Sequence, residues 1–279
     1  MRIDAHQHFW QLERGDYGWI TAELPAIHRD FLPPDLLPHL DACGIDRTVL
    51  VQAAPTVEET RFLLGIAESE PRVAGVVGWA DLAAPDARAV VDELAADPHL
   101  LGLRPMLQDI EDSDWVLSAN VLDALAHAAS RGLRMDALIQ PRHLGAIDAL
   151  ARRLPALPIV VDHVAKPRME RGVPPDAAWL DGLARLSGHP QVSCKLSGMA
   201  TELGAGWRAE DLAPFAEAVL GLFGAERVMW GSDWPVLELV GTYAEWHEAA
   251  GTFATALDER GRRALFGGTA ARFYGLDVP

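Results

Sequence analysis

Cysteine is nearly absent from this sequence, which contains only Cys43 and Cys194. Small secreted domains that depend on disulfides are much richer in cysteine, so the chain is not a scaffold of that kind. Cys194 lies inside an apolar, strand-like stretch, where buried free thiols are common. We therefore expect both cysteines to be unpaired and the protein to work in the reducing cytoplasm.

Basic residues are also few, since Lys and Arg number 24 against 40 Asp and Glu, a formal net charge of −16. Such a surface repels nucleic-acid phosphates and anionic membranes, so we expect neither as a partner. A small-molecule substrate is not excluded, because a cleft can carry its own Arg and Lys within an acidic surface. The composition does not set the oligomeric state.

Long apolar runs are missing as well, and none approaches the roughly 20 residues of a membrane-spanning helix. The opening MRIDAHQHFW has neither the basic region nor the apolar core of an export signal. No low-complexity segment or Gly/Ser-rich linker divides the chain. Hydrophobic residues make up 49% of the sequence, enough for a closed core, so we expect one soluble domain over residues 1–279.

Short apolar runs alternate with amphipathic stretches along the whole chain, a pattern typical of β/α units. The runs predict eight strands, over residues 2–8, 47–53, 73–81, 99–106, 133–139, 159–164, 192–197 and 227–233. Strands separated by helices run parallel, and eight such units can close into a (β/α)8 TIM barrel. An open, doubly wound sheet is the alternative.

Helix start and stop signals lie between these runs. Thr56 with Glu59, and Thr242 with Glu245, have the spacing of a capping box. Glycines follow three predicted helices, namely Gly44 after 35–43, Gly132 after 120–131 and Gly224 after 211–223. The connections 9–34 and 165–178 are unusually long, and in a barrel such loops after strands build or cover the site.

The strongest local signal is the run Asp4-Ala5-His6-Gln7-His8 at the end of the first strand. His6 and His8, at i and i+2, point to the same side of a strand and could share one metal ion. Two nearby histidines can also be incidental, so the other strands must supply partners.

The sixth and eighth strands supply such partners. An apolar run ends in Asp162-His163, and the eighth strand ends in Gly-Ser-Asp233. A carboxylate beside a histidine or a cation can take a proton from water, so Asp233 is the expected base, ahead of Asp4 and Asp162. The structural alternatives are a hydrogen-bonded core role for His163 and a turn-capping role for Asp233.

Arg104 and Lys195 interrupt apolar runs at the ends of the fourth and seventh strands. A guanidinium can bind a carboxylate or carbonyl oxygen, and an ammonium can stabilise developing negative charge. Each could instead form a structural ion pair.

Aromatic residues lie near the same strand ends. Trp10, Trp19 and Trp234 are placed to pack on a sugar ring or within a lid, so we expect Trp10 and Trp234 to bind substrate. Gln52, at the end of the second strand, is a weaker candidate for a hydroxyl contact.

With these motifs in place, nearly the whole chain resembles the amidohydrolase superfamily, in its amidohydrolase-related branch that contains sugar lactonases of the L-fuconolactonase and L-rhamnonolactonase type. The resemblance rests on IDAHQHFW from residue 3, VDH from residue 161, KLSG from residue 195 and WGSDWP from residue 230. It implies a distorted (β/α)8 barrel that hydrolyses aldonolactones to open-chain sugar acids.

The resemblance also implies roles for the site residues. His6, His8, His163 and Asp233 would surround the reacting carbonyl, and Asp233 would deprotonate the attacking water. His163 and Lys195, with any metal, would polarise the carbonyl and stabilise the oxyanion, while the Arg of the fourth strand would hold the substrate.

The fifth predicted strand departs from the superfamily pattern. Members with a firm metal site usually carry a histidine or lysine on the fourth or fifth strand, but here the fifth reads LRMDAL from residue 133, and His143 comes later. Members of this branch are described with and without a required metal, so the resemblance does not decide whether this protein needs one. If one binds at His6, His8 and Asp233, zinc is the expected ion; without it, the two imidazoles would donate hydrogen bonds to the substrate.

Two other functions remain open at this stage. A related branch carries out metal-dependent, non-oxidative decarboxylation, which the missing fifth-strand histidine disfavours. A barrel that binds a sugar acid without turnover is disfavoured by the joint presence of His6, His8, His163 and Asp233.

Overall fold

The computed structural model describes residues 1–277 and contains eight parallel strands in the sequential order β1 to β8. The strands are β1 (Ile3–Gln7), β2 (Arg47–Val51), β3 (Val73–Gly78), β4 (Leu100–Leu103), β5 (Arg134–Ala137), β6 (Ile159–Val161), β7 (Val192–Leu196) and β8 (Val228–Trp230). The first and last strands meet where Gln7 pairs in parallel with Trp234, just beyond β8. The predicted (β/α)8 barrel is therefore confirmed, and the open sheet is excluded.

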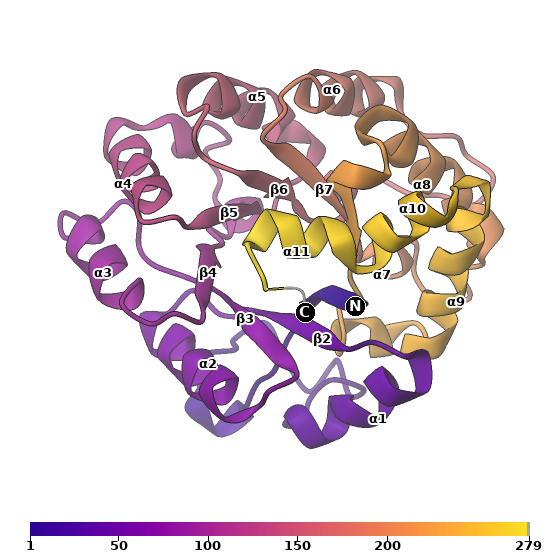
Figure 1. Ribbon diagram of the computed structural model, residues 1–279, viewed down its shortest axis with the longest axis horizontal. Coiled ribbons are helices and arrows are strands. Elements are labelled where there is room, and N and C mark those ends of the chain that lie inside the picture. Colours follow the sequence, from indigo (N-terminus) through magenta and orange to yellow (C-terminus); the bar gives the residue numbers. More distant parts are fainter. Residues whose placement is uncertain (278–279) are drawn as a thin grey trace.

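Helices form a ring around the strands (Figure 1). They are α1 (Pro33–Cys43), α2 (Val57–Ser69), α3 (Ala87–Leu94), α4 (Ala119–Ser130), α5 (Leu144–Arg153), α6 (Ala177–Ser187), α7 (Met199–Leu203), α8 (Ala209–Phe223), α9 (Tyr243–Phe253), α10 (Glu259–Arg263) and α11 (Thr269–Tyr274). In α3, Ala87, Val91 and Leu94 are buried at a spacing of three or four residues. This spacing gives the helix one apolar face, which packs toward the barrel.

The last helix, α11, lies across one end of the barrel in Figure 1, near the amino end of β1. Ala270, Ala271 and Tyr274 of this helix pack with an apolar cluster that includes Ile3 and Val49 from the strands. Because this cluster fills the interior of the barrel at its amino end, the interior can be open only at the carboxyl end. That is the end at which barrel enzymes carry their sites.

The strands are shorter than the sequence predicts, mainly at their carboxyl ends. Strand β6 stops at Val161 and β8 stops at Trp230, so the polar residues that follow each run lie in turns. Strand β1 contains a bulge, because Asp4 pairs with Thr48 whereas Gln7 pairs with Leu50. The extra residue breaks the strict alternation of side chains, and this re-aims the residues at the mouth of the barrel.

The predicted helix signals have mixed outcomes. Thr242 and Glu245 form a complete capping box at the start of α9. At α2 the Thr56 hydroxyl accepts from the Glu59 amide at 3.1 Å, but the Glu59 carboxylate turns away from Thr56. It accepts instead from the Ala53 amide at 3.0 Å and fixes the loop after β2. The capping box predicted there is therefore only half formed.

Glycines follow two of the three predicted helices directly, with Gly44 after α1 and Gly224 after α8. Helix α4 ends at Ser130 and is followed by Arg131, so Gly132 comes one residue later. Cys43 and Cys194 are free thiols, as predicted. Across residues 1–277, none of the helices combines the length and apolar character needed to cross a membrane.

Candidate active site

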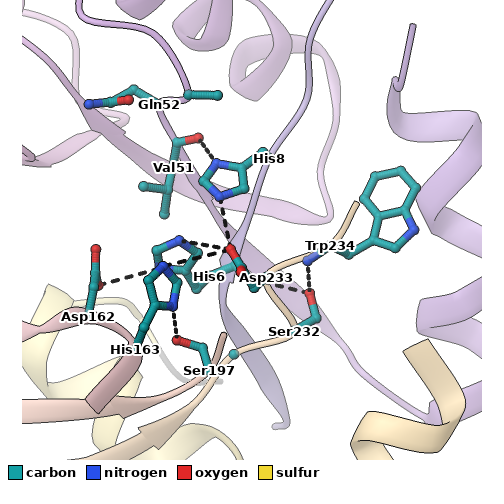
Figure 2. Close-up of polar contacts among 12 residues, drawn as sticks. His6, His8, Val51, Gln52, Asp162, His163, Ser197, Ser232, Asp233 and Trp234 are labelled. Carbon is teal, nitrogen blue, oxygen red and sulfur yellow. Dashed lines mark hydrogen bonds and ion pairs between the residues drawn. The ribbon is translucent and has the colours of Figure 1, made fainter. Parts of the chain in front are cut away.

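Asp233 lies at the centre of a group of histidines at the carboxyl end of the barrel (Figure 2). Its Oδ1 atom is 3.3 Å from His8 Nε2, 3.6 Å from His6 Nε2 and 3.8 Å from His163 Nε2. These side chains come from β1, from the residue that follows it, and from the turns after β6 and β8. The convergence that the strand ends predict is therefore present in the structure.

The backbone around Asp233 is held in a conformation that only tertiary contacts can maintain. Asp233 has φ 59°, in the left-handed region that residues other than glycine rarely adopt. Its amide donates to the His6 carbonyl at 2.8 Å, and the Ser232 amide donates to Asp4 Oδ1 at 2.9 Å. Asp4 therefore supports this turn, and burial raises the pKa of its carboxyl to about 6. Strain of this kind is common at functional sites.

His163 is held by an even less common turn. His163, Val164, Ala165 and Lys166 all have positive φ, and the Lys166 amide donates to the His163 carbonyl at 2.8 Å. Left-handed helical geometry costs roughly 1–2 kcal/mol per residue, so the surroundings must stabilise the turn. Trp179 contributes through its Nε1–H, which donates to the buried Val164 carbonyl at 2.8 Å. The turn points His163 toward Asp233 and brings Lys166 to the cavity.

The histidines present their Nε2 atoms to Asp233 because their other ring nitrogens are engaged. His8 Nδ1 donates to the Val51 carbonyl at 2.8 Å, and His163 Nδ1 lies 2.9 Å from Ser197 Oγ. Burial lowers the pKa of His163 to about 4, so its ring is neutral at neutral pH. Burial raises the pKa of Asp233, but the three surrounding imidazoles together outweigh burial, and the net shift is downward. Asp233 is therefore a carboxylate.

This arrangement fits a divalent metal ion. With Nδ1 bonded to a carbonyl, a neutral His8 ring directs its Nε2 lone pair at the Asp233 carboxylate. Two such acceptors repel one another unless a cation or a proton lies between them. His6, His163 and Asp233 offer three ligand atoms that lie within 4.8 Å of one another, a set that suits a borderline metal.

Arg104 extends from the end of β4 to the cluster of histidines and carboxylates around Asp233. Its Nη1 lies 3.4 Å from Asp162 Oδ2 and 3.4 Å from His6 Nε2, and its Nη2 donates to the Gln52 carbonyl. The Gln52 side chain donates in return to the Arg104 carbonyl at 2.9 Å. Gln52 is fully buried and does not line the cavity. It supports Arg104 from behind, although the sequence predicts it as a substrate contact.

Lys195 does not line the cavity either, because its side chain has 0% exposure. Its Nζ lies 2.5 Å from Asp136 Oδ2, 3.2 Å from Asp162 Oδ1 and 3.1 Å from His6 Nδ1. The Tyr274 hydroxyl of α11 donates to Asp136 at 2.8 Å, so this network runs from the closed end of the barrel to His6. The structure thus places Lys195 behind His6 and inside an ion-pair network.

The cavity above Asp233 has a volume of about 300 Å³. His8, Arg104, His163 and Asp233 line it, as the sequence predicts, together with Trp19. His6 is fully buried and contributes through Asp233 and Arg104.

Two predicted substrate contacts, Trp10 and Trp234, lie outside the cavity. Trp10 is buried, and its ring lies edge-on to Trp19 at a centroid distance of 5.6 Å. Trp234 points away from the histidines in Figure 2 and packs against Phe31 at 5.2 Å. Both rings pack against Phe31 in the loop after β1, and Trp10 helps to hold the partly exposed Trp19 at the cavity.

Three polar residues of the cavity were not identified from the sequence, namely Gln108, Asp109 and Lys166. Lys166 follows the Asp-His end of β6 within a connection that the sequence marks as long. The segment after Arg104 gives a weaker signal, its Met-Leu-Gln-Asp composition being typical of many loops.

Comparison with known proteins identifies the family of the chain. The family described as Amidohydrolase matches residues 3–276. The chain belongs to the amidohydrolase family. This assignment agrees with the eight-stranded barrel that the structure shows.

The chain has full-length relatives with assigned names. It is 45% identical to an L-fucono-1,5-lactonase from Burkholderia ambifaria, with 100% of this chain and 97% of that protein covered. It is 39% identical to an L-fucono-1,5-lactonase from Burkholderia multivorans, with the same coverage. A crystal structure of an amidohydrolase from B. multivorans with bound zinc is 38% identical in sequence and superposes with a TM-score of 0.92. The match covers 99% of this chain and 100% of that one.

Proposed function

We propose that this protein hydrolyses the lactone of a sugar acid, L-fucono-1,5-lactone or a sugar lactone close to it, to the open-chain acid in sugar catabolism. The observation that carries the proposal is the ionised Asp233 under a cavity of about 300 Å³, with imidazoles around one of its oxygens. The names of the relatives at 45% and 39% identity support the substrate class.

The proposed reaction needs one proton acceptor and groups that stabilise the oxyanion. Asp233 takes a proton from water as the water oxygen attacks the lactone carbonyl carbon. The guanidinium of Arg104 and the imidazole of His163 lie beside Asp233 and stabilise the negative charge that develops on the carbonyl oxygen. When the ring C–O bond breaks, Asp233 returns the proton to the leaving oxygen. The products are a hydroxyl group and a carboxylic acid, which then ionises to a carboxylate by releasing its proton to solvent.

The cavity also suits a polyhydroxylated ring. Trp19, which is 39% exposed, offers an aromatic surface on which the C–H face of a sugar can pack. Its Nε1–H donates to the Ala53 carbonyl at 2.8 Å, and this bond fixes the indole. Gln108 and Asp109 come from another loop, after β4, and supply groups that can bind hydroxyls.

We propose that His6, His8, His163 and Asp233 hold one divalent ion, zinc in the first instance. When bound, such an ion polarises the carbonyl and lowers the pKa of a coordinated water. Lys195, which the sequence assigns to the oxyanion, acts in this proposal through His6, since it is buried behind that ring. A metal-dependent decarboxylase and a non-catalytic binding barrel are less well supported, because the relatives at 45% and 39% identity are named as lactonases.

We further propose that residues 1–279 act as one catalytic domain, because elements from Ile3 to Tyr274 contribute to a single barrel. We also propose a cytoplasmic location, because the free thiols of Cys43 and Cys194 suit a reducing compartment.

The direct test is a pH-indicator assay with a panel of aldonolactones that includes L-fucono-1,5-lactone, its ring epimers and 1,4-lactones. Purified protein should release acid faster than the spontaneous rate for a subset of 1,5-lactones, both as purified and after addition of zinc or manganese. No acceleration with any sugar lactone would contradict the proposal. Release of carbon dioxide from an aromatic carboxylate would favour the decarboxylase instead.

A further inference from the structure

The cavity owes two of its polar groups to a short segment between β4 and α4. This segment, residues 107–113, is called the wall segment below. It carries Gln108 and Asp109, which line the cavity, and it begins with a single 3-10 turn over Leu107–Asp109. A loop of this kind has few regular backbone bonds of its own, so other groups must fix its shape.

Arg142 supplies much of that fixation. Its Nη1 donates to the Glu111 carbonyl at 3.0 Å and to Ser113 Oγ at 2.7 Å. Its Nη2 donates to the carbonyls of Gln108 at 3.2 Å and Ile110 at 2.8 Å. Its Nε donates to Gln140 Oε1 at 3.3 Å. All five N–H groups of a guanidinium are thus used, four of them on the wall segment.

The guanidinium is itself anchored in the neighbouring loop, after β5. Arg142 lies in the 3-10 turn Pro141–His143, whose last residue is buried and accepts from the Gln140 amide through His143 Nδ1 at 3.0 Å. A backbone bond joins the same two loops, since the Gln108 amide donates to the Leu138 carbonyl at 3.1 Å. Leu138 also lines the cavity. The wall segment is therefore fastened to a fixed part of the barrel mouth.

Among the residues that the structure describes, the contacts of Arg142 do not include an ion pair. Within residues 1–277, Arg142 has no carboxylate within ion-pair distance, and every acceptor that it binds is an uncharged oxygen. What the site uses is the forked, planar geometry of the guanidinium, which a lysine ammonium cannot reproduce.

We propose that Arg142 is a positioning residue that holds Gln108 and Asp109 against the hydroxyls of the substrate ring and so sets which sugar lactone is accepted. This inference rests on the proposed lactonase function. The Gln108 amide can donate and accept, and the Asp109 carboxylate only accepts, so together they distinguish hydroxyls by position and orientation. A site built to bind a hydroxyl discriminates strongly against a substrate that places it elsewhere, because its polar groups are then left unpaired.

The first test compares Arg142→Met, which keeps the chain length, and Arg142→Lys, which keeps the charge. We expect both to raise KM for the preferred lactone about tenfold, with kcat within about threefold of the wild type. The ratio of kcat/KM between two lactones epimeric at one ring carbon should fall by a similar factor. Arg152→Met is the matched control, because Arg152 is exposed on α5 and bonds only to Asp148.

Gln108→Ala and Asp109→Ala separate positioning from direct contact. At least one of them should reproduce the loss of discrimination, and adding Arg142→Met to that variant should cost little more, because the two changes remove one function. If Arg142→Met leaves both KM and the epimer ratio unchanged, the inference is overturned.

Amide hydrogen exchange provides a readout that does not depend on turnover. Arg142→Met should accelerate exchange at residues 107–113 and leave the strands of the barrel unchanged. Unchanged exchange would show that Arg142 does not hold the segment, even if activity fell. If the wild type hydrolyses no lactone, the proposed function fails together with the hydroxyl recognition, and the exchange result still decides whether Arg142 fixes the wall segment.

Discussion

Lys195 Nζ lies 3.1 Å from Nδ1 of His6, on the opposite side of the imidazole from Asp233, which faces Nε2 at 3.6 Å. The ammonium therefore acts on the site from behind that ring and does not line the cavity. It also lies within bonding distance of Asp136 and Asp162, both fully buried. Burial raises the pKa of Asp136 to about 6. For Asp162, burial also acts to raise the pKa, but Lys195 and the neighbouring histidines together outweigh burial, and the pKa falls.

Replacement of Lys195 by methionine should therefore reduce stability as well as activity. Lys195→Met leaves two buried carboxylates without their shared counter-charge, and breaking such a pair costs about 3–5 kcal/mol. We expect urea denaturation to show a loss of that order in the free energy of unfolding. The double variant Lys195→Met with Asp136→Asn should recover part of it, because one of the orphaned charges is removed. Equal stability of the single variant and the wild type would contradict the ion-pair role.

The sequence predicts the barrel and the convergence of His6, His8, His163 and Asp233 because both depend on local pattern. Apolar runs define the strands, and the polar residue that ends a parallel strand lies at the barrel mouth whatever the loops do. The depth of a side chain within the barrel has no such signature. The sequence therefore predicts that Lys195 points into the barrel, but only the structure shows that its side chain is buried behind His6.

Loop residues could not be ranked from the sequence for a related reason. Trp10 and Trp19 look equivalent, yet the fold of their loop buries the first and exposes the second. The left-handed turn from His163 to Lys166 contains no glycine, the residue that would predict positive φ angles from the sequence. Gln108 enters the site through bonds from Arg142, which lies 34 residues away in sequence. Tertiary contacts decide each of these placements, and local propensity does not.

Asp233→Asn is expected to keep the fold and remove most of the activity. The amide is close in size to the carboxylate, but it cannot accept a proton from water. We expect kcat for the preferred lactone to fall roughly 10²- to 10⁴-fold, as for loss of a general base. Steady-state kinetics with a circular dichroism spectrum measure both effects. Full activity in this variant would remove Asp233 from the mechanism.

Arg104→Ala should affect binding more than turnover. The guanidinium lines the cavity and can bond the lactone or the carboxylate product, so its loss should raise KM about tenfold to a hundredfold. Gln52→Ala offers a matched comparison, because Gln52 holds Arg104 without lining the cavity. It should shift KM in the same direction but by less. An unchanged KM in Arg104→Ala would argue against substrate binding by this residue.

Metal binding can be tested separately from activity. Protein stripped with a chelator should bind one zinc ion per chain, as measured by titration calorimetry and elemental analysis. His163→Gln should weaken the affinity about 10- to 100-fold or more, since it removes one of the clustered ligand atoms. His143→Gln serves as a control because His143 lies in the turn after β5, outside the cluster. Absence of stoichiometric binding in the wild type would remove the metal from the proposal.

His247 makes stability depend on pH at a point remote from the cavity. Burial and then the charge of Arg2 lower its pKa to about 4, from the 6.5 expected of an unfolded chain, and Arg2 Nη2 lies 2.7 Å from His247 Nε2. Between these pKa values the unfolded state binds more protons, so the stability present above pH 6.5 is lost as the pH falls toward 4. His247→Gln can still accept from Arg2 but cannot be protonated, so its free energy of unfolding should fall less steeply over this range. Urea denaturation at several pH values measures the slope, with exposed His28→Gln as the control; equal slopes for His247→Gln and the wild type would assign the acid sensitivity to other groups.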